Sequence, residues 1–121
     1  MIIADTSSWV DHFRHKETPL RSLLKDARIL LHPFVMGELL LHDLPKRGEA
    51  AKLLETLDPA PLATPAEVAA MIGWAKLAGK GIGYVDAHLL MSAKMTQNGR
   101  VLTQDRKLLA QAKRLQIAYA P

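Results

Sequence analysis

The chain has 121 residues, which is enough for a single domain, residues 1–121, that buries about two thirds of the surface of its unfolded form. Hydrophobic residues make up 49% of it and aromatic residues only 5%, so we expect a core of aliphatic side chains. The absence of cysteine excludes a disulfide framework, thiolate metal sites and cysteine nucleophiles, and it fits the reducing cytoplasm.

Net charge and hydropathy further restrict the class of protein and the kind of partner. The formal net charge of +4 and the pI near 9.6 favour an anionic partner. The opening segment MIIADTSSW turns polar too soon for a signal peptide, and no apolar run approaches the length of about 18 residues that crosses a membrane. We therefore expect a soluble protein without a membrane partner.

Strand-like and helix-like segments alternate along the chain. Short aliphatic runs predict strands at residues 2–4, 28–32, around 62, 100–103 and 117–119. Helical spacing of apolar residues predicts helices at about residues 9–15, 19–27, 34–42, 48–57, 65–77, 84–95 and 106–115. Strands separated by helices predict an α/β fold, with a parallel sheet covered by helices on both faces.

Two helix starts depend on proline. The run FVMGELLLH is apolar on nearly every side, but it lacks the alternation of a strand and follows Pro33, so a helix is predicted there. The segment Thr64-Pro65-Ala66-Glu67 has the form of a capping box with Pro at the first helical position. The next helix is therefore expected to begin at Pro65.

Four carboxylates are set singly inside or at the tips of apolar runs. The runs read MIIAD, FVMGELLL, IGYVDAHLL and VLTQD, and the acids are Asp5, Glu38, Asp86 and Asp105. An ionised carboxylate that is buried without a partner costs several kcal/mol, so it normally shifts its pKa, finds a cation or binds a metal. No basic residue accompanies these acids within their own runs, which indicates one shared cation.

The predicted elements bring these acids towards one place. Asp5 ends the first strand, and Asp105 lies two residues past the strand that ends at Thr103. Glu38 falls on the helix after the second predicted strand. Ligands of open parallel sheets bind outside the carboxyl ends of the strands, where these three acids meet. Asp86, in the first turn of its helix, can join them.

Three of the four acids also have a purely structural explanation. Asp5 and Asp105 suit helix caps, and Asp86 complements the dipole at a helix N-terminus. Glu38 has no such explanation, because it lies in the middle of an apolar helix. The interpretation that four unrelated structural carboxylates meet at one edge of the sheet is less favoured than a shared site.

A cluster of carboxylates without His or Cys ligands suits hard cations, Mg²⁺ or Mn²⁺ rather than zinc. Such ions assist phosphoryl chemistry by polarising the phosphate and by lowering the pKa of a bound water. Four acids leave room for two ions. Together with the basic composition, the cluster predicts a metal-dependent hydrolase that acts on a nucleic-acid phosphodiester.

At these residues the chain resembles a PIN-domain nuclease, and more narrowly a VapC-type toxin of a toxin–antitoxin pair. The resemblance runs almost end to end and rests on IIADTSSWVDHFR, the GELLL helix, IGYVDAHLLMSA and RVLTQDRKLLAQAKRL. It implies that the four acids hold Mg²⁺ or Mn²⁺ for endoribonuclease cleavage, with Thr6 or Ser7 and Thr103 organising the site. The implied fold is a three-layer α/β/α sandwich with a parallel sheet of four or five strands.

The resemblance also implies partners. Toxins of this family usually form homodimers and are silenced by a cognate VapB-type antitoxin, whose tail blocks the acidic groove. The middle segment, residues 46–80, matches in helical character alone. Arg14, Arg106 and Lys107 lie on the helices that follow Asp5 and Asp105, and we expect them to steer RNA phosphates towards the cleft.

Two other classes remain as alternatives. A non-catalytic PIN-like module that binds RNA or protein is favoured only if one of the four acids is displaced. A metal-dependent phosphatase on a related sheet needs a D-x-D arrangement after the first strand, whereas Thr6 and Ser7 follow Asp5 here.

Overall fold

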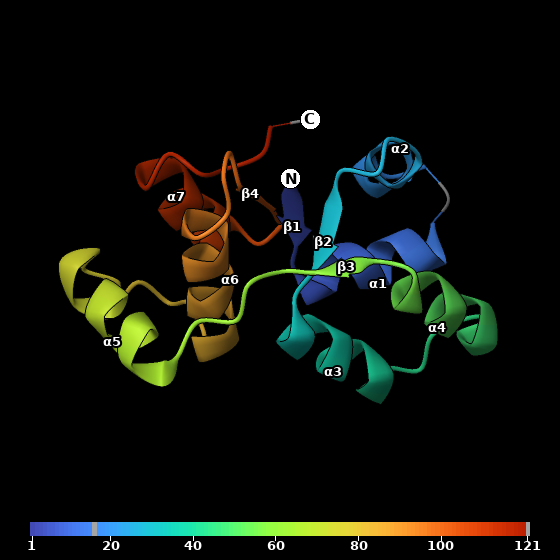
Figure 1. The fold of residues 1–121 in the computed structure, drawn as a ribbon, viewed down its shortest axis with the longest axis horizontal. Coiled ribbons are helices and arrows are strands. Elements are labelled where there is room, and N and C mark those ends of the chain that lie inside the picture. Colours follow the sequence, from blue (N-terminus) through green and yellow to red (C-terminus); the bar gives the residue numbers. More distant parts are fainter. Residues whose placement is uncertain (16, 121) are drawn as a thin grey trace.

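The chain alternates short strands with helices, as its sequence predicts. The computed structural model describes residues 1–15 and 17–120 (Figure 1). The strands are β1 (Ile2–Ala4), β2 (Ile29–Leu31), β3 (Asp58–Pro59) and β4 (Arg100–Leu102). The helices are α1 (Thr6–Arg14), α2 (Pro19–Lys25), α3 (Pro33–Leu41), α4 (Arg47–Glu55), α5 (Pro65–Trp74), α6 (Tyr84–Lys94) and α7 (Arg106–Arg114).

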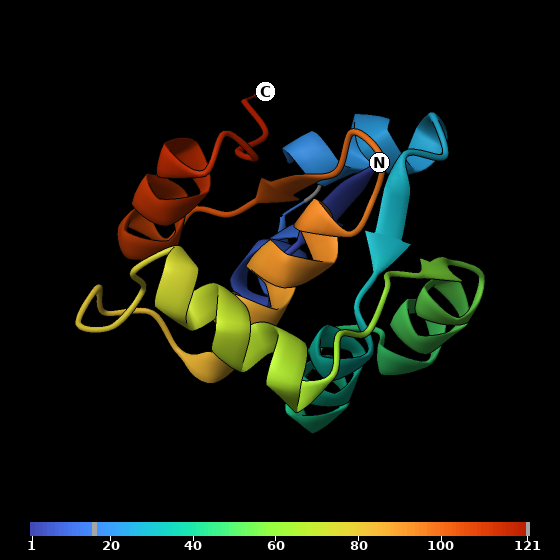
Figure 2. The same ribbon diagram turned by 60° about the vertical axis from the view of Figure 1, so that its left-hand side comes forward.

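All four strands are parallel, in the order β3-β2-β1-β4. From β1 the chain moves to β2 on one side and later returns to β4 on the other side. Right-handed crossovers in opposite directions place their helices on opposite faces of a sheet. Accordingly α5 and α6 lie in front of the sheet and α1 and α2 lie behind it in Figure 2. The expected three-layer α/β/α fold is confirmed.

The core is aliphatic, because β1 and most of β4 are buried. Ile2, Ile3 and Val101 are at most 1% exposed, and they pack with residues of the surrounding helices. Trp9 is a fully buried aromatic residue of this core. Since β1 and β2 consist of aliphatic residues, the polar groups at the carboxyl edge of the sheet come from the loops and helices around the strand ends.

Two strand predictions need correction. The short strand expected around Leu62 is wrong, because β3 lies at Asp58–Pro59 and Leu62 is 51% exposed. Proline is tolerated in β3 because this strand forms the outer edge of the sheet. The last expected strand, residues 117–119, is reduced to one parallel bridge between Ala118 and Val101.

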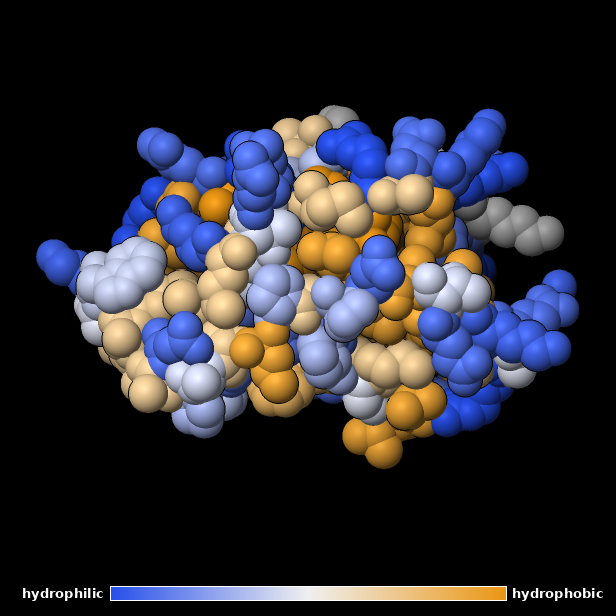
Figure 3. All heavy atoms as spheres, in the orientation of Figure 1, coloured by the Kyte–Doolittle hydropathy of each residue, from blue (hydrophilic) through white to orange (hydrophobic). Residues whose placement is uncertain are grey.

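Several large apolar side chains reach the surface. Figure 3 shows hydrophobic atoms at the centre of one face and at its lower edge, over α3. Leu40 and Leu41 of α3 are 49% and 89% exposed. Within residues 1–15 and 17–120 no helix is long and apolar enough to span a bilayer.

Candidate active site

The four singled-out acids line one pocket at the carboxyl edge of the sheet. This pocket, of about 390 Å³, is bordered by Asp5, Thr6, Ser7, Glu38, Gly83, Tyr84, Val85, Asp86, Leu89 and Asp105. The acids come from four separate elements: the end of β1, helix α3, the first turn of α6 and the residue before α7. The structure therefore brings together carboxylates that are far apart in the sequence.

Asp5 is the most constrained of these acids. It follows β1 directly and caps α1, since its carboxylate accepts the Ser8 backbone N–H at 3.0 Å. The hydroxyls of Ser7, at 3.1 Å, and Thr103, at 2.5 Å, also donate to this carboxylate. Asp5 is 5% exposed, so these donors take the place of water around a buried charge.

Thr6 and Thr103, the two hydroxyl residues expected at the site, both contact pocket acids. The Thr6 hydroxyl donates to Glu38 at 2.5 Å and thereby joins the start of α1 to the middle of α3. The Thr103 oxygen also accepts the backbone N–H of Asp105 at 3.0 Å. Thr103 therefore connects the carboxylate that follows β1 with the loop that follows β4.

Asp86 and Asp105 are held at the N-termini of their helices. The backbone N–H of Gly83 donates to Asp86 at 3.2 Å, and the N–H groups of Lys107 and Leu108 donate to Asp105 at 2.9 and 3.0 Å. Burial raises the pKa of the Asp86 carboxyl, the hydrogen bond from Gly83 opposes this rise, and the negative charges of the other three pocket acids add to it. The four carboxylates thus share one electrostatic environment.

Burial differs among the four acids more than their apolar surroundings in the sequence suggest. Asp5 is buried, Glu38 and Asp86 are half-buried, and Asp105 is exposed. Of the four acids, Asp5 therefore bears the full free-energy cost of burying an ionised carboxylate. The residues directly after Glu38 and Asp86, Leu39 and Ala87, are buried, whereas Leu40 and Leu41 of the Glu38 run are exposed.

Among the described residues, no basic side chain forms an ion pair with the pocket acids. In the described part of the chain the ion pairs join His15 to Asp11 and Arg21 to Glu17. Nor do any three acidic or histidine side chains, among residues 1–15 and 17–120, converge closely enough to enclose an ion. Each carboxylate is turned towards its own hydroxyl or amide donor instead. The donor set nevertheless fits a hard divalent cation, which takes carboxylate oxygens and retains several waters.

Comparison with known proteins decides the family. A model of the PIN domain matches residues 2–115. The chain belongs to the PIN-domain family. Ribonuclease VapC32 of Mycobacterium tuberculosis, in strains CDC 1551 and H37Rv, is 37% identical over 120 residues, which cover 99% of this chain and 97% of that protein. The chain is a VapC-type PIN-domain ribonuclease, as its motifs predict.

Two solved structures share the PIN fold. PAE2754 from Pyrobaculum aerophilum superposes with a TM-score of 0.63 at 18% identity, over 93% of this chain and 79% of that one. FitAcB from Neisseria gonorrhoeae superposes with a TM-score of 0.60 at 22% identity, over 93% of this chain and 94% of that one. At these identities the likeness concerns the fold.

Lys107 of α7 lies against the loop that precedes α6. Its side chain crosses the loop before α6, where a Cβ atom built on Gly81 would lie 2.7 Å from Cδ and 3.2 Å from Nζ of Lys107. Gly81 has a φ of +79°, so this loop combines a left-handed backbone with the close approach of a cation. Lys107 is thus close to the loop that leads to Gly83, a residue of the pocket lining.

The other two basic residues expected to face RNA differ in position. Arg14 is exposed at the end of α1 and lines a neighbouring pocket, which shares Thr6 and Ser7 with the carboxylate pocket. Arg106 is exposed at the first residue of α7, directly after Asp105. The two arginines therefore flank the carboxylate pocket.

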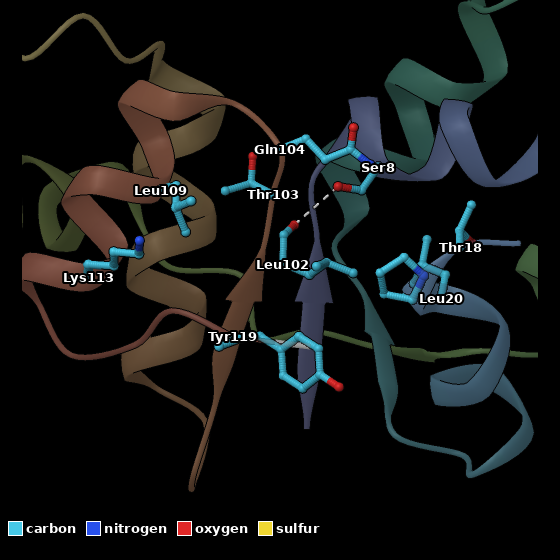
Figure 4. A pocket seen from close by; sticks show the side chains of 11 residues that line it. Ser8, Thr18, Leu20, Leu102, Thr103, Gln104, Leu109, Lys113 and Tyr119 are labelled. Carbon is cyan, nitrogen blue, oxygen red and sulfur yellow. Dashed lines mark hydrogen bonds between the residues drawn. The ribbon is translucent and has the colours of Figure 1, made fainter.

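A second pocket lies along β4 on the other side of Thr103 (Figure 4). It has a volume of about 280 Å³ and runs from Ser8 and Gln104 to Tyr119, between α7 and α2. Its walls are largely aliphatic and carry no carboxylate, so it lacks the ligands for metal-assisted chemistry.

Sequence reasoning missed some residues that shape the carboxylate pocket. The backbone N–H groups of Ser8 and Gly83 hold Asp5 and Asp86, and each follows a capping pattern that is visible in the sequence. Tyr84 also lines the pocket, although no role was predicted for it. The sequence feature that could have identified Tyr84 as a pocket residue is its position two residues before Asp86.

Proposed function

We propose that Asp5, Glu38, Asp86 and Asp105 hold Mg²⁺, or Mn²⁺ in its place, and that the chain uses this site to hydrolyse RNA. The carrying observation is that four carboxylates from separate elements line one pocket without an ion-pair partner among the described residues. The PIN-domain match and the VapC32 relative support an endoribonuclease of a toxin–antitoxin pair.

The divalent cation would polarise the scissile phosphate and lower the pKa of the attacking water. The hydroxyl side chains of the protein would hold the carboxylate ligands in position. Thr6 orients Glu38, and Thr103 orients Asp5 while it accepts the Asp105 N–H. These hydrogen bonds hold each carboxylate beside its own donor, so the carboxylates would have to turn towards one another to share a metal ion.

Charge on the rim supports an RNA substrate. Lys107 lies against the loop before α6, and Arg14 and Arg106 are exposed on the helices next to the pocket acids. Phosphate groups contacted by such side chains release counterions, which gives binding a strong dependence on salt. These three residues would place the RNA backbone over the acids.

The proposed partners follow from the family. A VapB-type antitoxin would cover the carboxylate pocket, and a second copy of the chain would complete a homodimer. The name of the FitAcB structure and that of VapC32 support an antitoxin partner for this chain.

Replacement of pocket acids tests the proposed site. Asp86→Asn and Asp5→Asn should each lower RNA cleavage at least about 100-fold in Mg²⁺, because the site loses a metal ligand and a negative charge. Asp43→Asn, which changes an exposed acid outside the pocket, is the matched control. Cleavage of total RNA, with and without EDTA, measures the effect. Full activity of both pocket variants, or activity in EDTA, would contradict the proposal.

A non-catalytic binding module is the second candidate. The observation in its favour is that no three pocket acids of the described chain converge on one point. Calorimetric titration with Mn²⁺ separates the two candidates. Uptake by the wild-type chain that Asp86→Asn weakens supports the nuclease, and the absence of uptake supports the module.

A further inference from the structure

Two exposed aromatic rings lie beside the carboxylate pocket. Tyr84 lines the pocket and is 53% exposed, and Phe34 is 36% exposed. Both residues sit on helices that carry pocket acids: Tyr84 is two residues ahead of Asp86 on α6, and Phe34 is one helical turn ahead of Glu38 on α3. Tyr84 therefore belongs to the pocket lining, whereas Phe34 lies outside the lining on the same helix as Glu38.

A buried histidine braces both rings. The His88 ring lies 4.7 Å from the Tyr84 ring and 4.7 Å from the Phe34 ring, with interplanar angles of 86° and 66°. His88 is 2% exposed, so it holds the rings from the protein side. Behind it, His32 lies 5.2 Å from Phe34, and its Nδ1 accepts the Phe34 backbone N–H at 3.0 Å. The rings are thus fixed in place although they are exposed.

This geometry leaves ring surface free. A perpendicular neighbour covers at most one face of an aromatic ring, and the contact of Tyr84 with His88 is close to perpendicular. A rigid, exposed ring costs little conformational entropy when a ligand binds to it. The unpaired bases of single-stranded RNA stack on such rings, whereas bases inside a duplex are not available for stacking.

We propose that Tyr84, with Phe34 beside it, forms a stacking platform for an unpaired nucleobase next to the scissile phosphate. This inference rests on the proposed ribonuclease function. The platform would favour cleavage in loops and single strands, because the base has to leave its own stack to reach the ring. It would also set the distance between the stacked base and the phosphate that lies over Asp86.

The experiment combines a protein change with removal of a base. A single-stranded oligoribonucleotide that the wild-type chain cleaves is compared with versions that carry one abasic site at successive positions near the cleaved bond. For wild-type protein we expect one abasic position to raise KM about 10-fold. Tyr84→Ala should raise KM by a similar factor on the intact oligonucleotide and should show no further rise at that position. Tyr84→Phe keeps the ring and should behave as wild type.

Trp74→Ala provides the matched control, because Trp74 is 58% exposed but does not line the carboxylate pocket. It should keep the sensitivity to the abasic site, and thermal melting should show all variants folded. An equal loss from the abasic site in wild-type protein and in Tyr84→Ala would overturn the platform. So would a change in dimer mass or antitoxin affinity of Tyr84→Ala with unchanged RNA kinetics. Absence of cleavage by wild-type protein in Mg²⁺ would instead reject the ribonuclease proposal, and the platform with it.

Discussion

Thr103 illustrates how single residues organise the pocket. Its hydroxyl donates to the buried Asp5 and accepts the N–H of Asp105, so one side chain links the ends of β1 and β4. A threonine directly after a strand serves this purpose well, because its χ1 angle is stiff. The proposed metal ligands are therefore supported by short polar side chains rather than by ion pairs.

Gly81 and Lys107 form a second arrangement at the scale of single residues. We predict that Gly81→Ala raises KM for RNA, by no more than Lys107→Ala does, because the new Cβ atom would displace the flexible end of the lysine side chain. The double variant should show no further loss. The slope of log K against log salt should also fall by about 0.7, the value for one lost phosphate contact on a single strand.

Gly79 supplies the control for backbone strain. Its φ is +75°, close to that of Gly81 at +79°, but a Cβ atom there meets nothing within 4 Å. Gly79→Ala should therefore lower the melting temperature much as Gly81→Ala does, since an L-residue in this conformation costs about 1 kcal/mol or more. Unchanged KM in Gly81→Ala, or an equal rise in Gly79→Ala, would show that the lysine is not positioned by this glycine.

At the scale of the element, α3 depends on the protonation of the residue that caps it. The Nδ1 atom of His32 accepts the N–H of Phe34, which requires the neutral imidazole at that atom. Burial, and to a smaller extent the neighbouring His88, lowers the pKa of His32 from 6.5 to about 4. The fold thus holds His32 neutral at a pH where the unfolded chain protonates it.

The sign of the pH effect follows from this shift. Between pH 6.5 and 4 the unfolded chain binds more protons than the folded chain, so the free energy of unfolding falls as the pH is lowered through this range. His32 contributes a loss of about 3 kcal/mol across it, at 1.36 kcal/mol per pKa unit. His32→Asn retains a cap acceptor without this titration, and its free energy of unfolding should fall less on acidification.

Urea unfolding at pH 7 and pH 4.5 measures the difference. Burial also lowers the pKa of His88, so only the difference between wild type and His32→Asn belongs to His32. Equal losses in both proteins would contradict the prediction.

At the scale of the whole molecule, we predict that the chain forms the proposed homodimer through α3. Leu40 and Leu41 are 49% and 89% exposed, and an exposed apolar pair of this kind is a common mark of an interface. Leu41→Lys should halve the mass measured by light scattering, towards the 13.4 kDa of one chain. Met95→Lys, which changes an exposed residue after α6, should leave the mass unchanged. A wild-type mass of one chain would reject the dimer.

Most elements of the fold follow from local patterns. Prolines and capping residues mark the starts of α2, α3 and α5, and aliphatic runs mark the three longer strands. The prediction is wrong where local pattern and sheet position disagree. The sequence around Leu62 resembles a strand, but the segment that pairs with β2 is Asp58–Pro59. Proline fits there because an edge strand needs hydrogen bonds on one side alone.

The sequence by itself determined the alternation of strands and helices, the PIN-domain motifs and the identity of the four acids. These features depend on residue type and on spacing over a few positions. Only the tertiary structure decided that the acids line one pocket, that Thr103 reaches Asp5 across 98 positions, and that Tyr84 and Phe34 meet on His88. Contacts between distant residues are set by how the helices pack on the sheet, and no local propensity encodes that packing.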